Sequence, residues 1–236
     1  MSLSSPYGFD QDHAQVRPRI ASCVLLLAGL AVAIAASARA GTPGASFFDG
    51  TFVDADWIVT LTDASVNGEV TAQQTMGGNP GYYRDVEQEL TDLPGLVQAI
   101  HAHTGFVFEP ILGGEILSVD WSIDFFNLQV GQAVALAIEQ DGIWYIGDVF
   151  VTTSFGPGIW TSRERIGLTE SDFPGVDFSS NGAPLSFGFF TANSGEVGVF
   201  RVGYDNFGVR LWGESFSDGF ESGDVCAWSS ASEGCD

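Results

Sequence analysis

Acidic side chains are the residues of this sequence best suited to chemistry, because paired carboxylates cleave glycosidic bonds. A retaining pair needs carboxyl groups about 5–5.5 Å apart, and an inverting pair about 6.5–9.5 Å. Asp120 and Asp124 share one face of a predicted strand, but at about 3.3 Å per residue they are roughly 13 Å apart. Glu115 falls on the opposite face. This strand therefore lacks the carboxylate spacing of a glycoside hydrolase.

Two further acidic pairs, Asp54/Asp56 and Glu87/Glu89, are each two residues apart. On a strand that spacing is about 6.6 Å. The chain contains 30 Asp and Glu, so such pairs are expected by chance. We interpret them as solvated acids.

Histidine, serine and cysteine give no stronger catalytic pattern. His101 and His103 would project to one side of a strand, but zinc takes three or four ligands, and Glu109 is only one possible third. No G-x-S-x-G elbow supports a serine nucleophile. We therefore assign no catalytic residue and favour a non-catalytic role, with an extracellular glycoside hydrolase as the weakest alternative.

Aromatic side chains next to polar groups are typical of sugar-binding sites. The candidate ligand-binding residues are Tyr82, Tyr83, Arg84, Tyr145 and Trp160. Adjacent residues of a strand point to opposite faces, so we expect Trp144 in the core and Tyr145 outside. The alternatives are core packing for the aromatic residues and an ion pair with Asp85 or Glu87 for Arg84.

Alternating patterns predict the β-strands that would position these residues. The segment 115–125 places Leu117, Val119, Trp121, Ile123 and Phe125 on one face and Ser118, Asp120, Ser122 and Asp124 on the other. Segments 133–138, 185–189 and 204–211 are also predicted strands, and 52–61 is the predicted first strand. Asp141-Gly142 predicts a hairpin turn, followed by a return strand from Trp144 to Phe150.

Turn signals are frequent between these strands, at 77–81, 113–114, 156–158 and 181–182. Asp92–His103 is the one plausible short helix, with a strand as the alternative. Short strands separated by Gly/Pro turns are typical of all-β proteins. The predicted fold is an all-β, antiparallel β-sandwich of jelly-roll type.

The charge balance excludes several classes of partner. All eight basic residues are Arg, and the formal net charge is −22. Nucleic-acid binding requires clustered Lys and Arg, and anionic lipid attracts basic segments, so we expect neither partner. A hydrophobic content of 45% indicates a folded domain rather than an acidic disordered chain.

Residues 1–40 have the pattern of a signal peptide. Arg17 and Arg19 precede the apolar run 20–36, and Ala38-Arg39-Ala40 is a small-residue cleavage signal. We expect cleavage after Ala40, no stable membrane span afterwards, and a secreted, periplasmic or cell-surface protein. A retained membrane anchor is the alternative.

The expected organisation after the leader is a β-sandwich domain at 41–211 and an acidic, Ser/Gly-rich tail at 212–236. The tail holds Cys226 and Cys235. A cysteine pair in an exported chain favours a disulfide, so we predict a Cys226–Cys235 bond.

Four segments carry a resemblance: 77–81 (GGNPG), 116–124 (ILSVDWSID), 185–189 (LSFGF) and 203–209 (GYDNFGV). Together they resemble uncharacterised exported bacterial jelly-roll domains, similar to concanavalin A-like and galactose-binding-like sandwiches. The resemblance covers roughly residues 47–211. It implies a sandwich fold but no catalytic motif.

The same resemblance implies a structural calcium ion where the first and last strands meet. Calcium takes six to eight oxygen ligands, and the candidates are Asp49, Asp205 and Asn206. The alternative is that Asp205 and Asn206 only make turn and edge hydrogen bonds.

These observations lead to one functional hypothesis and its main competitor. The sequence favours an exported, non-catalytic β-sandwich module that binds a glycan or another cell-surface polymer. The competing hypothesis is a structural or adhesive surface protein with no small ligand.

Overall fold

The computed structural model describes residues 42–64, 68–91, 93, 95–129, 131–153, 159–194 and 196–213. The chain divides into units 1–39 and 40–236, and every described residue lies in the second. The predicted leader and the predicted Cys226–Cys235 disulfide lie outside the described residues. No described helix is long and apolar enough to cross a membrane.

Two six-stranded sheets form the described domain, and every strand pair in them is antiparallel. Sheet A has the order β10-β6-β12-β4-β3, with β1 also paired to β12. Its strands are β1 (Thr42–Asp49), β3 (Gly68–Gly78), β4 (Gly81–Leu90), β6 (Ile116–Asn127), β10 (Thr161–Leu168) and β12 (Gly198–Gly213). The predicted antiparallel sandwich is confirmed.

Sheet B has the order β2-β5-β11-β7-β8, and β9 also pairs with β7. Its strands are β2 (Trp57–Ala64), β5 (Leu96–Phe108), β7 (Ala133–Gln140), β8 (Ile143–Ile146), β9 (Phe150–Val151) and β11 (Leu185–Ser194). The helical elements are short: η1 (Asp54–Asp56), α1 (Pro110–Gly113) and η2 (Glu170–Asp172).

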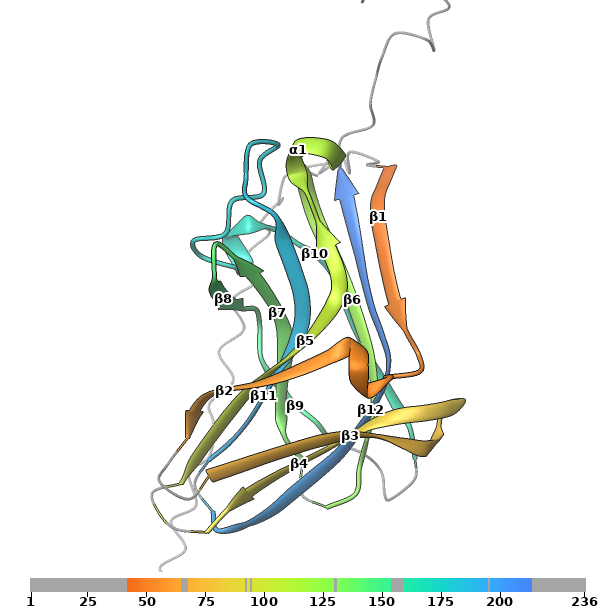
Figure 1. Ribbon diagram of the computed structural model, residues 1–236, viewed down its shortest axis with the longest axis vertical. Helices are drawn as coiled ribbons and strands as arrows, with labels where there is room; N and C mark the ends of the chain where they lie inside the picture. The colour runs from red at the N-terminus through yellow and green to blue at the C-terminus, as the bar shows by residue number, and fades with distance from the viewer. Residues whose placement is uncertain are drawn as a thin grey trace, which may run out of the picture. The chain divides into compact units, whose positions relative to one another are not determined.

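The long strand β12 joins two differently oriented parts of sheet A. Residues 198–204 pair with β4, and residues 207–213 pair with β1 on the same side. Figure 1 shows β3 and β4 at a steep angle to β1, with β12 running past all three. The register of β12 shifts between Asp205 and Gly208, where Asn206 has a φ of 51°. This irregularity lets two strands share one edge of β12.

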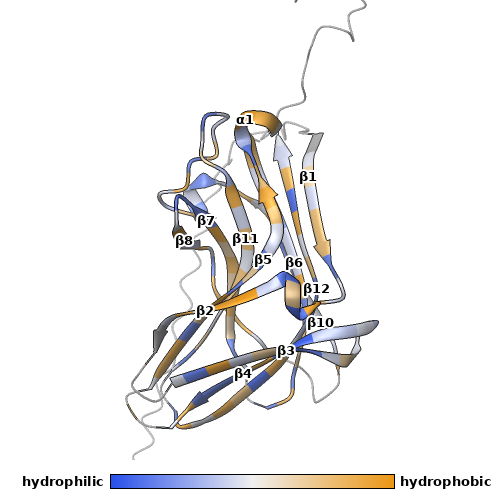
Figure 2. Ribbon diagram, viewed as in Figure 1, coloured by the Kyte–Doolittle hydropathy of each residue, from blue (hydrophilic) through white to orange (hydrophobic). Residues whose placement is uncertain are grey.

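The core lies between the sheets and is rich in aromatic rings. Phe189 of β11 is surrounded by the rings of Trp57, Tyr204 and Phe207, with centroids 5.1–5.8 Å away. Such pairs add about 0.5–1.5 kcal/mol beyond area burial. Figure 2 shows apolar and polar residues interleaved along the strands, as expected when one face of each strand is buried.

Several strand predictions are confirmed and others are corrected. The 115–125 alternation is β6, with Val119, Trp121 and Ile123 buried, and Asp141-Gly142 is the β7–β8 turn. The helix predicted at Asp92–His103 is wrong and the strand alternative holds, because residues 96–103 belong to β5. The predicted first strand is displaced, since residues 52–56 form a turn and η1, and β1 precedes them.

A charged residue, Arg84 of β4, is buried in this interior. Its side chain is 2% exposed, and its guanidinium lies 5.5 Å from the Trp57 ring centre. Its Nη1 is 3.6 Å from the exposed carboxylate of Asp54 and has no hydrogen-bond partner within the described part of the chain. Burial lowers the pKa of Arg84 to about 10, although Asp54 and Asp49 oppose the shift.

Arg84 also influences a buried histidine. Its Nε donates to Nδ1 of His101 at 3.5 Å, and Nε2 of His101 lies 3.0 Å from the Thr191 hydroxyl. Burial, and then the charge of Arg84, hold the pKa of His101 well below its usual value. We therefore describe His101 as neutral, accepting from Arg84 and donating to Thr191.

Replacing Arg84 by Met should leave the free energy of unfolding unchanged or raise it by about 1–2 kcal/mol, because an apolar chain of similar length avoids the cost of burying a charge. Arg84→Ala should instead lower it by about 2 kcal/mol or more by opening a cavity. Urea unfolding of both variants measures the difference. A loss of more than about 3 kcal/mol in the Met variant would mean that the contacts of Arg84 outweigh its desolvation.

Candidate functional site

The outward face of sheet A carries a shallow groove across four strands. In one cross-strand row, Phe48 of β1 lies opposite Gly208 of β12, Gly208 opposite Ser122 of β6, and Ser122 opposite Glu164 of β10. Phe48 is 65% exposed although it is aromatic, and Glu164 is also exposed. The row therefore presents an apolar ring, a gap, a hydroxyl and a carboxylate in order.

A second row runs beside the first, from Ser46 of β1 through Arg210 of β12 to Asp120 of β6. Both oxygens of Asp120 are held: Oδ2 accepts from Trp212 Nε1 at 2.6 Å and Oδ1 from the Gly167 backbone at 2.8 Å. Arg210 is exposed, with its guanidinium 5.7 Å from the Trp212 ring centre. The second row thus adds a cation beside a fixed carboxylate.

Gly208 forms the floor between these rows. The groove has a volume of about 160 Å³ and is lined by Ser46, Phe48, Asp120, Ser122, Glu164, Gly208 and Arg210 together with the backbone between them. A Cβ at position 208 would lie 3.0 Å from Ser122 Oγ and 3.6 Å from the Phe48 ring. The missing side chain therefore keeps the hollow open beside the exposed ring. We call this hollow the Phe48 groove.

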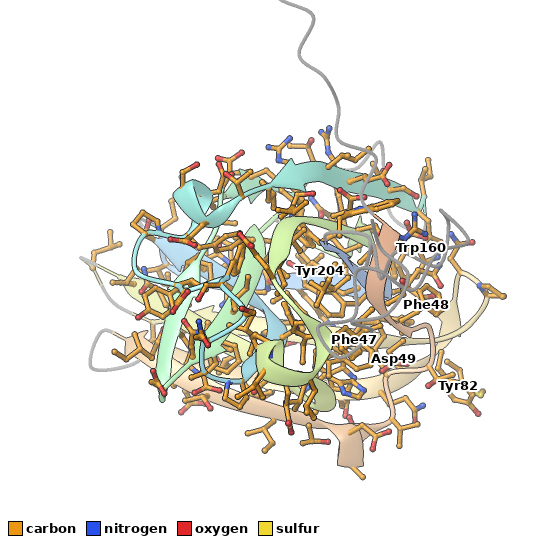
Figure 3. The ribbon with its side chains drawn as sticks, turned by 90° about the horizontal axis from the view of Figure 1, so that it is seen from above. Phe47, Phe48, Asp49, Tyr82, Trp160 and Tyr204 are labelled. Atoms are coloured by element: carbon orange, nitrogen blue, oxygen red, sulfur yellow. The ribbon has the colours of Figure 1, made fainter. Side chains whose placement is uncertain are left out.

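An aromatic cluster lies further along the same face, over Gly203 of β12. Trp160 is 5.7 Å from Tyr83 and 4.5 Å from Phe126 between ring centres. Tyr83 and Phe126 are each 6% exposed, whereas Trp160 is half-buried. Two predicted ligand-binding residues, Tyr83 and Trp160, are thus brought together, and Trp160 keeps the more accessible ring. Figure 3 shows Trp160 and Phe48 on the same side of the domain.

Polar residues lie between the aromatic cluster and the Phe48 groove. The Asp124 carboxylate of β6 accepts from Ser162, from Asn79 Nδ2 at 3.1 Å and from Asn206 Nδ2 at 2.8 Å. Asn206 also donates to the Asn79 carbonyl at 2.6 Å. Carboxylates and amides of this kind offer hydrogen bonds to hydroxyl-rich ligands.

Asp205, a predicted calcium ligand, is fully buried and holds the bend of β12. Its carboxylate accepts the backbone N–H of Asn79 and that of Asn206. Burial raises the pKa of Asp205, the two hydrogen bonds oppose this, and the charges of Asp124 and Asp49 add to it. The contacts of Asp205 and Asn206 are the turn and edge hydrogen bonds of the alternative interpretation.

Asp49, the third predicted calcium ligand, organises the chain between β1 and η1. One oxygen accepts the backbone N–H of Thr51 and of Phe52, at 2.7 and 2.9 Å, and the other accepts Trp57 Nε1 at 2.7 Å. Burial alone would raise the pKa of Asp49, but these hydrogen bonds outweigh it and lower the pKa. Within the described residues, no three His, Cys, Asp or Glu side chains are grouped to hold a metal ion.

The other predicted ligand-binding residues lie elsewhere. Tyr82 is 43% exposed and Arg84 is in the interior. The expected orientation of the Trp144-Tyr145 pair is wrong: Tyr145 pairs with Ile138 and packs on the main core, whereas Trp144 packs on the outward face of sheet B. Trp144 and Ile146 share the outward face of sheet B, which is itself apolar, so an apolar side chain in this strand does not mark the core.

Sequence reasoning missed Phe48, Glu164, Gly208 and Arg210 as parts of one groove. The adjacent Phe47-Phe48 pair would be a signal only once β1 is recognised as a strand, because one of two adjacent strand residues faces outward. No sequence signal shows that β1, β12, β6 and β10 are neighbours in that order.

Comparison with known proteins gives only structural similarities. No family model matches the chain, and no curated protein matches it in sequence. The family 11 carbohydrate-binding module from Clostridium thermocellum, solved with a β-1,3-1,4-mixed-linked tetrasaccharide, is 16% identical with a TM-score of 0.45, covering 72% of this chain and 96% of that one.

A second similar structure is the family 30 carbohydrate-binding module of a cellulosomal cellulase of Clostridium thermocellum. It is 13% identical with a TM-score of 0.47, covering 69% of this chain and 96% of that one. Scores at this level assign no ligand to the present chain.

Asp49→Asn should reduce stability at neutral pH by about 1–3 kcal/mol, because one amide N–H₂ would face a donor. The pKa of Asp49 is lower in the folded state than its unfolded value of 3.8. Its ionised carboxylate therefore stabilises the fold at pH values above 3.8, and this stabilisation is lost as the pH falls through the folded-state pKa. Urea unfolding at pH 7 and pH 2.5 should show the two proteins converging at low pH.

Glu69→Gln is the matched control, since Glu69 is exposed on β3. A constant difference between Asp49→Asn and the native chain at both pH values would contradict the assigned role of the Asp49 charge.

Proposed function

We propose that this chain is an exported, non-catalytic carbohydrate-binding module, and that the glycan lies along the outward face of sheet A in the Phe48 groove. The observation that carries the proposal is the open floor at Gly208 beside the 65% exposed ring of Phe48. Sugar rings stack on aromatic faces, and their hydroxyls exchange hydrogen bonds with nearby polar side chains.

The polar lining supports this ligand class. The Arg210 guanidinium donates, the Glu164 carboxylate accepts, and the Ser122 hydroxyl can do both. The net charge of −22 disfavours a polyanionic glycan. The ligand that fits best is therefore a neutral glycan.

The aromatic cluster at Trp160 supports a ligand longer than one sugar. Gly203 and Gly208 lie five residues apart on β12, roughly 16 Å along a strand. A chain of sugars that stacks on Phe48 could reach the half-buried Trp160 across the polar residues around Asp124. Export rests on the leader pattern of residues 1–40, in which two arginines precede an apolar run and a small-residue cleavage signal.

Binding should be tested by screening the native chain against neutral and acidic polysaccharides, followed by titration calorimetry of the best ligand. Phe48→Ala should weaken binding about tenfold or more, or about 1.4 kcal/mol, because it removes the stacking platform. Gly208→Val should abolish binding by filling the groove floor. Both variants should keep the native melting temperature within a few degrees.

Met76→Ala is the matched control, because Met76 is 73% exposed on β3 outside the groove. Equal affinities for Phe48→Ala and Met76→Ala would contradict the assigned site. An absence of binding to every polysaccharide, with and without calcium, would favour the structural or adhesive alternative.

Structural calcium stays a prediction for Asp49, Asp205 and Asn206. If these oxygens hold an ion, millimolar calcium should raise the melting temperature and a chelator should reverse the effect, because a ligand that binds only the folded state stabilises it. Asp205→Asn should remove the response. A melting temperature that is unchanged by calcium would mean that these side chains serve only the hydrogen bonds described above.

A further inference from the structure

Arg210 of β12 is an exposed cation on the outward face of sheet A. Within the described residues, its guanidinium makes no ion pair and no hydrogen bond, although the chain holds 30 Asp and Glu. It lies against the ring of Trp212, whose centre is 5.7 Å away. Arg201, on the same strand, does pair with a carboxylate, that of Asp85. An unpaired arginine in so acidic a chain must therefore have a local cause.

The cause lies in the carboxylate directly opposite. Asp120 of β6 is the register partner of Arg210, and opposite charges attract at such cross-strand positions. Asp120 instead accepts from Trp212 Nε1 at 2.6 Å and from the Gly167 backbone at 2.8 Å, one bond on each oxygen. These two bonds fix the orientation of the carboxylate. The Trp212 side chain thus acts twice, because its N–H holds Asp120 and its ring lies against Arg210.

This arrangement leaves the donors of Arg210 available to a ligand. A guanidinium is planar, and it loses little freedom on binding because its donors already form a rigid fork. Arg210 is two residues from Gly208 on β12, roughly 6.6 Å along the strand, and both line the groove together with Phe48. A sugar ring that stacks on Phe48 therefore brings the hydroxyls of its rim next to the guanidinium.

The charges of the groove favour a neutral sugar as the partner of Arg210. Glu164 of β10 also lines the groove, is exposed, and makes no ion pair or hydrogen bond with any described residue. A sugar carboxylate would bind Arg210 but would be repelled by Glu164 and Asp120. A hydroxyl both accepts and donates, so a neutral sugar can use the free cation and the free carboxylate together.

We propose that Arg210 is the specificity-determining residue of the Phe48 groove, where its guanidinium donates two parallel hydrogen bonds to adjacent hydroxyl groups of a neutral sugar. Two neighbouring hydroxyl oxygens offer the side-by-side acceptors that a guanidinium fork binds in a carboxylate. Trp212 and Asp120 are positioning residues that keep the fork unpaired. This inference rests on the proposed glycan-binding function, and it names the chemical group that the site reads.

The first test uses calorimetry with the best neutral polysaccharide, or an oligosaccharide cut from it, and three variants of the full chain. Arg210→Met should weaken binding about tenfold, because it removes hydrogen bonds from a charged donor. Arg210→Lys should weaken it to a similar extent, since an ammonium keeps the charge but lacks the planar fork. Melting temperatures check that each variant is folded.

Arg163→Met is the matched control. Arg163 is also exposed, and its guanidinium also lies near an aromatic ring, 5.8 Å from the centre of Phe150, but it is not part of the groove lining. This variant should bind with native affinity.

The second test changes the ligand, with monodeoxy derivatives of the same oligosaccharide. Removing either of two adjacent hydroxyls should weaken binding to the native chain about tenfold. The same two derivatives should bind Arg210→Met as well as the parent sugar does, because the partner of those hydroxyls is already absent. Such non-additivity identifies a direct contact.

The positioning role of Trp212 has its own readout. Trp212→Phe keeps a ring but removes the N–H that holds Asp120, so Asp120 can turn to pair with Arg210, and affinity should fall severalfold. Adding Asp120→Ala to Trp212→Phe removes the competing carboxylate and should restore most of the lost affinity. A loss of affinity that the second substitution does not restore would contradict this role.

Two outcomes overturn the assignment to Arg210 while glycan binding stands. One is native affinity in Arg210→Met when Phe48→Ala binds weakly. The other is native affinity in Arg210→Lys combined with binding that weakens as salt is raised, which would mean that charge rather than the fork is read. If the native chain binds no neutral glycan at all, the proposed function fails and this inference fails with it.

Discussion

The Asp205 carboxylate and the two backbone N–H groups that it accepts are the interaction on which the architecture of sheet A depends. They fix β12 where its register shifts and Asn206 takes a positive φ. Residues 198–204, which precede this point in the chain, pair with β4, and residues 207–213, which follow it, pair with β1. Without the bend, one strand edge could not serve two partners at different angles, and Phe48 would not lie beside Gly208. A buried carboxylate is costly unless it is hydrogen-bonded, which explains why this one has backbone donors.

The two outward faces of the sandwich differ in chemistry although both belong to antiparallel sheets. Sheet A presents carboxylates, amides and an arginine around an aromatic ring, whereas the central strands of sheet B present alanines, a glycine and a phenylalanine. In an antiparallel sheet of this kind, one face is expected to pack on the core and the other to be polar and exposed to solvent. The two outward faces of the described domain therefore differ, one polar around Phe48 and the other apolar.

The sequence allowed a good prediction of strands whose outward residues are polar and a poor one of the others. The alternation of β6 is clear because Ser118, Asp120, Ser122 and Asp124 face outward. The orientation of Trp144 and Tyr145 was assigned wrongly, because the outward face of sheet B is itself apolar and gives no contrast. Strand β1 is absent from the sequence prediction because no alternation marks it, and its pairing partners on β12 lie far away in the sequence, for example Asp49 opposite Phe207.

Site prediction failed for a related reason. Carboxylates are visible in a sequence as possible ligands, but the donors that occupy them are not. Asp49 receives its hydrogen bonds from nearby residues, so its turn was foreseeable. Asp205 accepts a hydrogen bond from Asn79, which lies 126 positions away in the sequence. The role of Asp205 could therefore not be foreseen from its neighbours in the chain. From the sequence alone Arg84 is expected to be a surface cation. In the fold it is buried beside His101 of β5 and Asp54 of η1.

Gly203 and Gly208 of β12 lie in different surroundings, although both lack a side chain. The side chains next to each glycine decide whether the gap above it is filled or open. A Cβ at Gly203 would lie 2.3 Å from the Phe126 ring and 2.9 Å from Tyr83, so that gap is already filled by aromatic side chains. At Gly208 the nearest atoms are a serine hydroxyl at 3.0 Å and the edge of an exposed phenylalanine at 3.6 Å, so the gap stays open. The same missing side chain therefore makes a packed cluster at one position and a groove at the other. Of the predicted ligand-binding residues, Tyr83 and Trp160 therefore lie in the packed cluster over Gly203, and the open groove lies five residues further along β12.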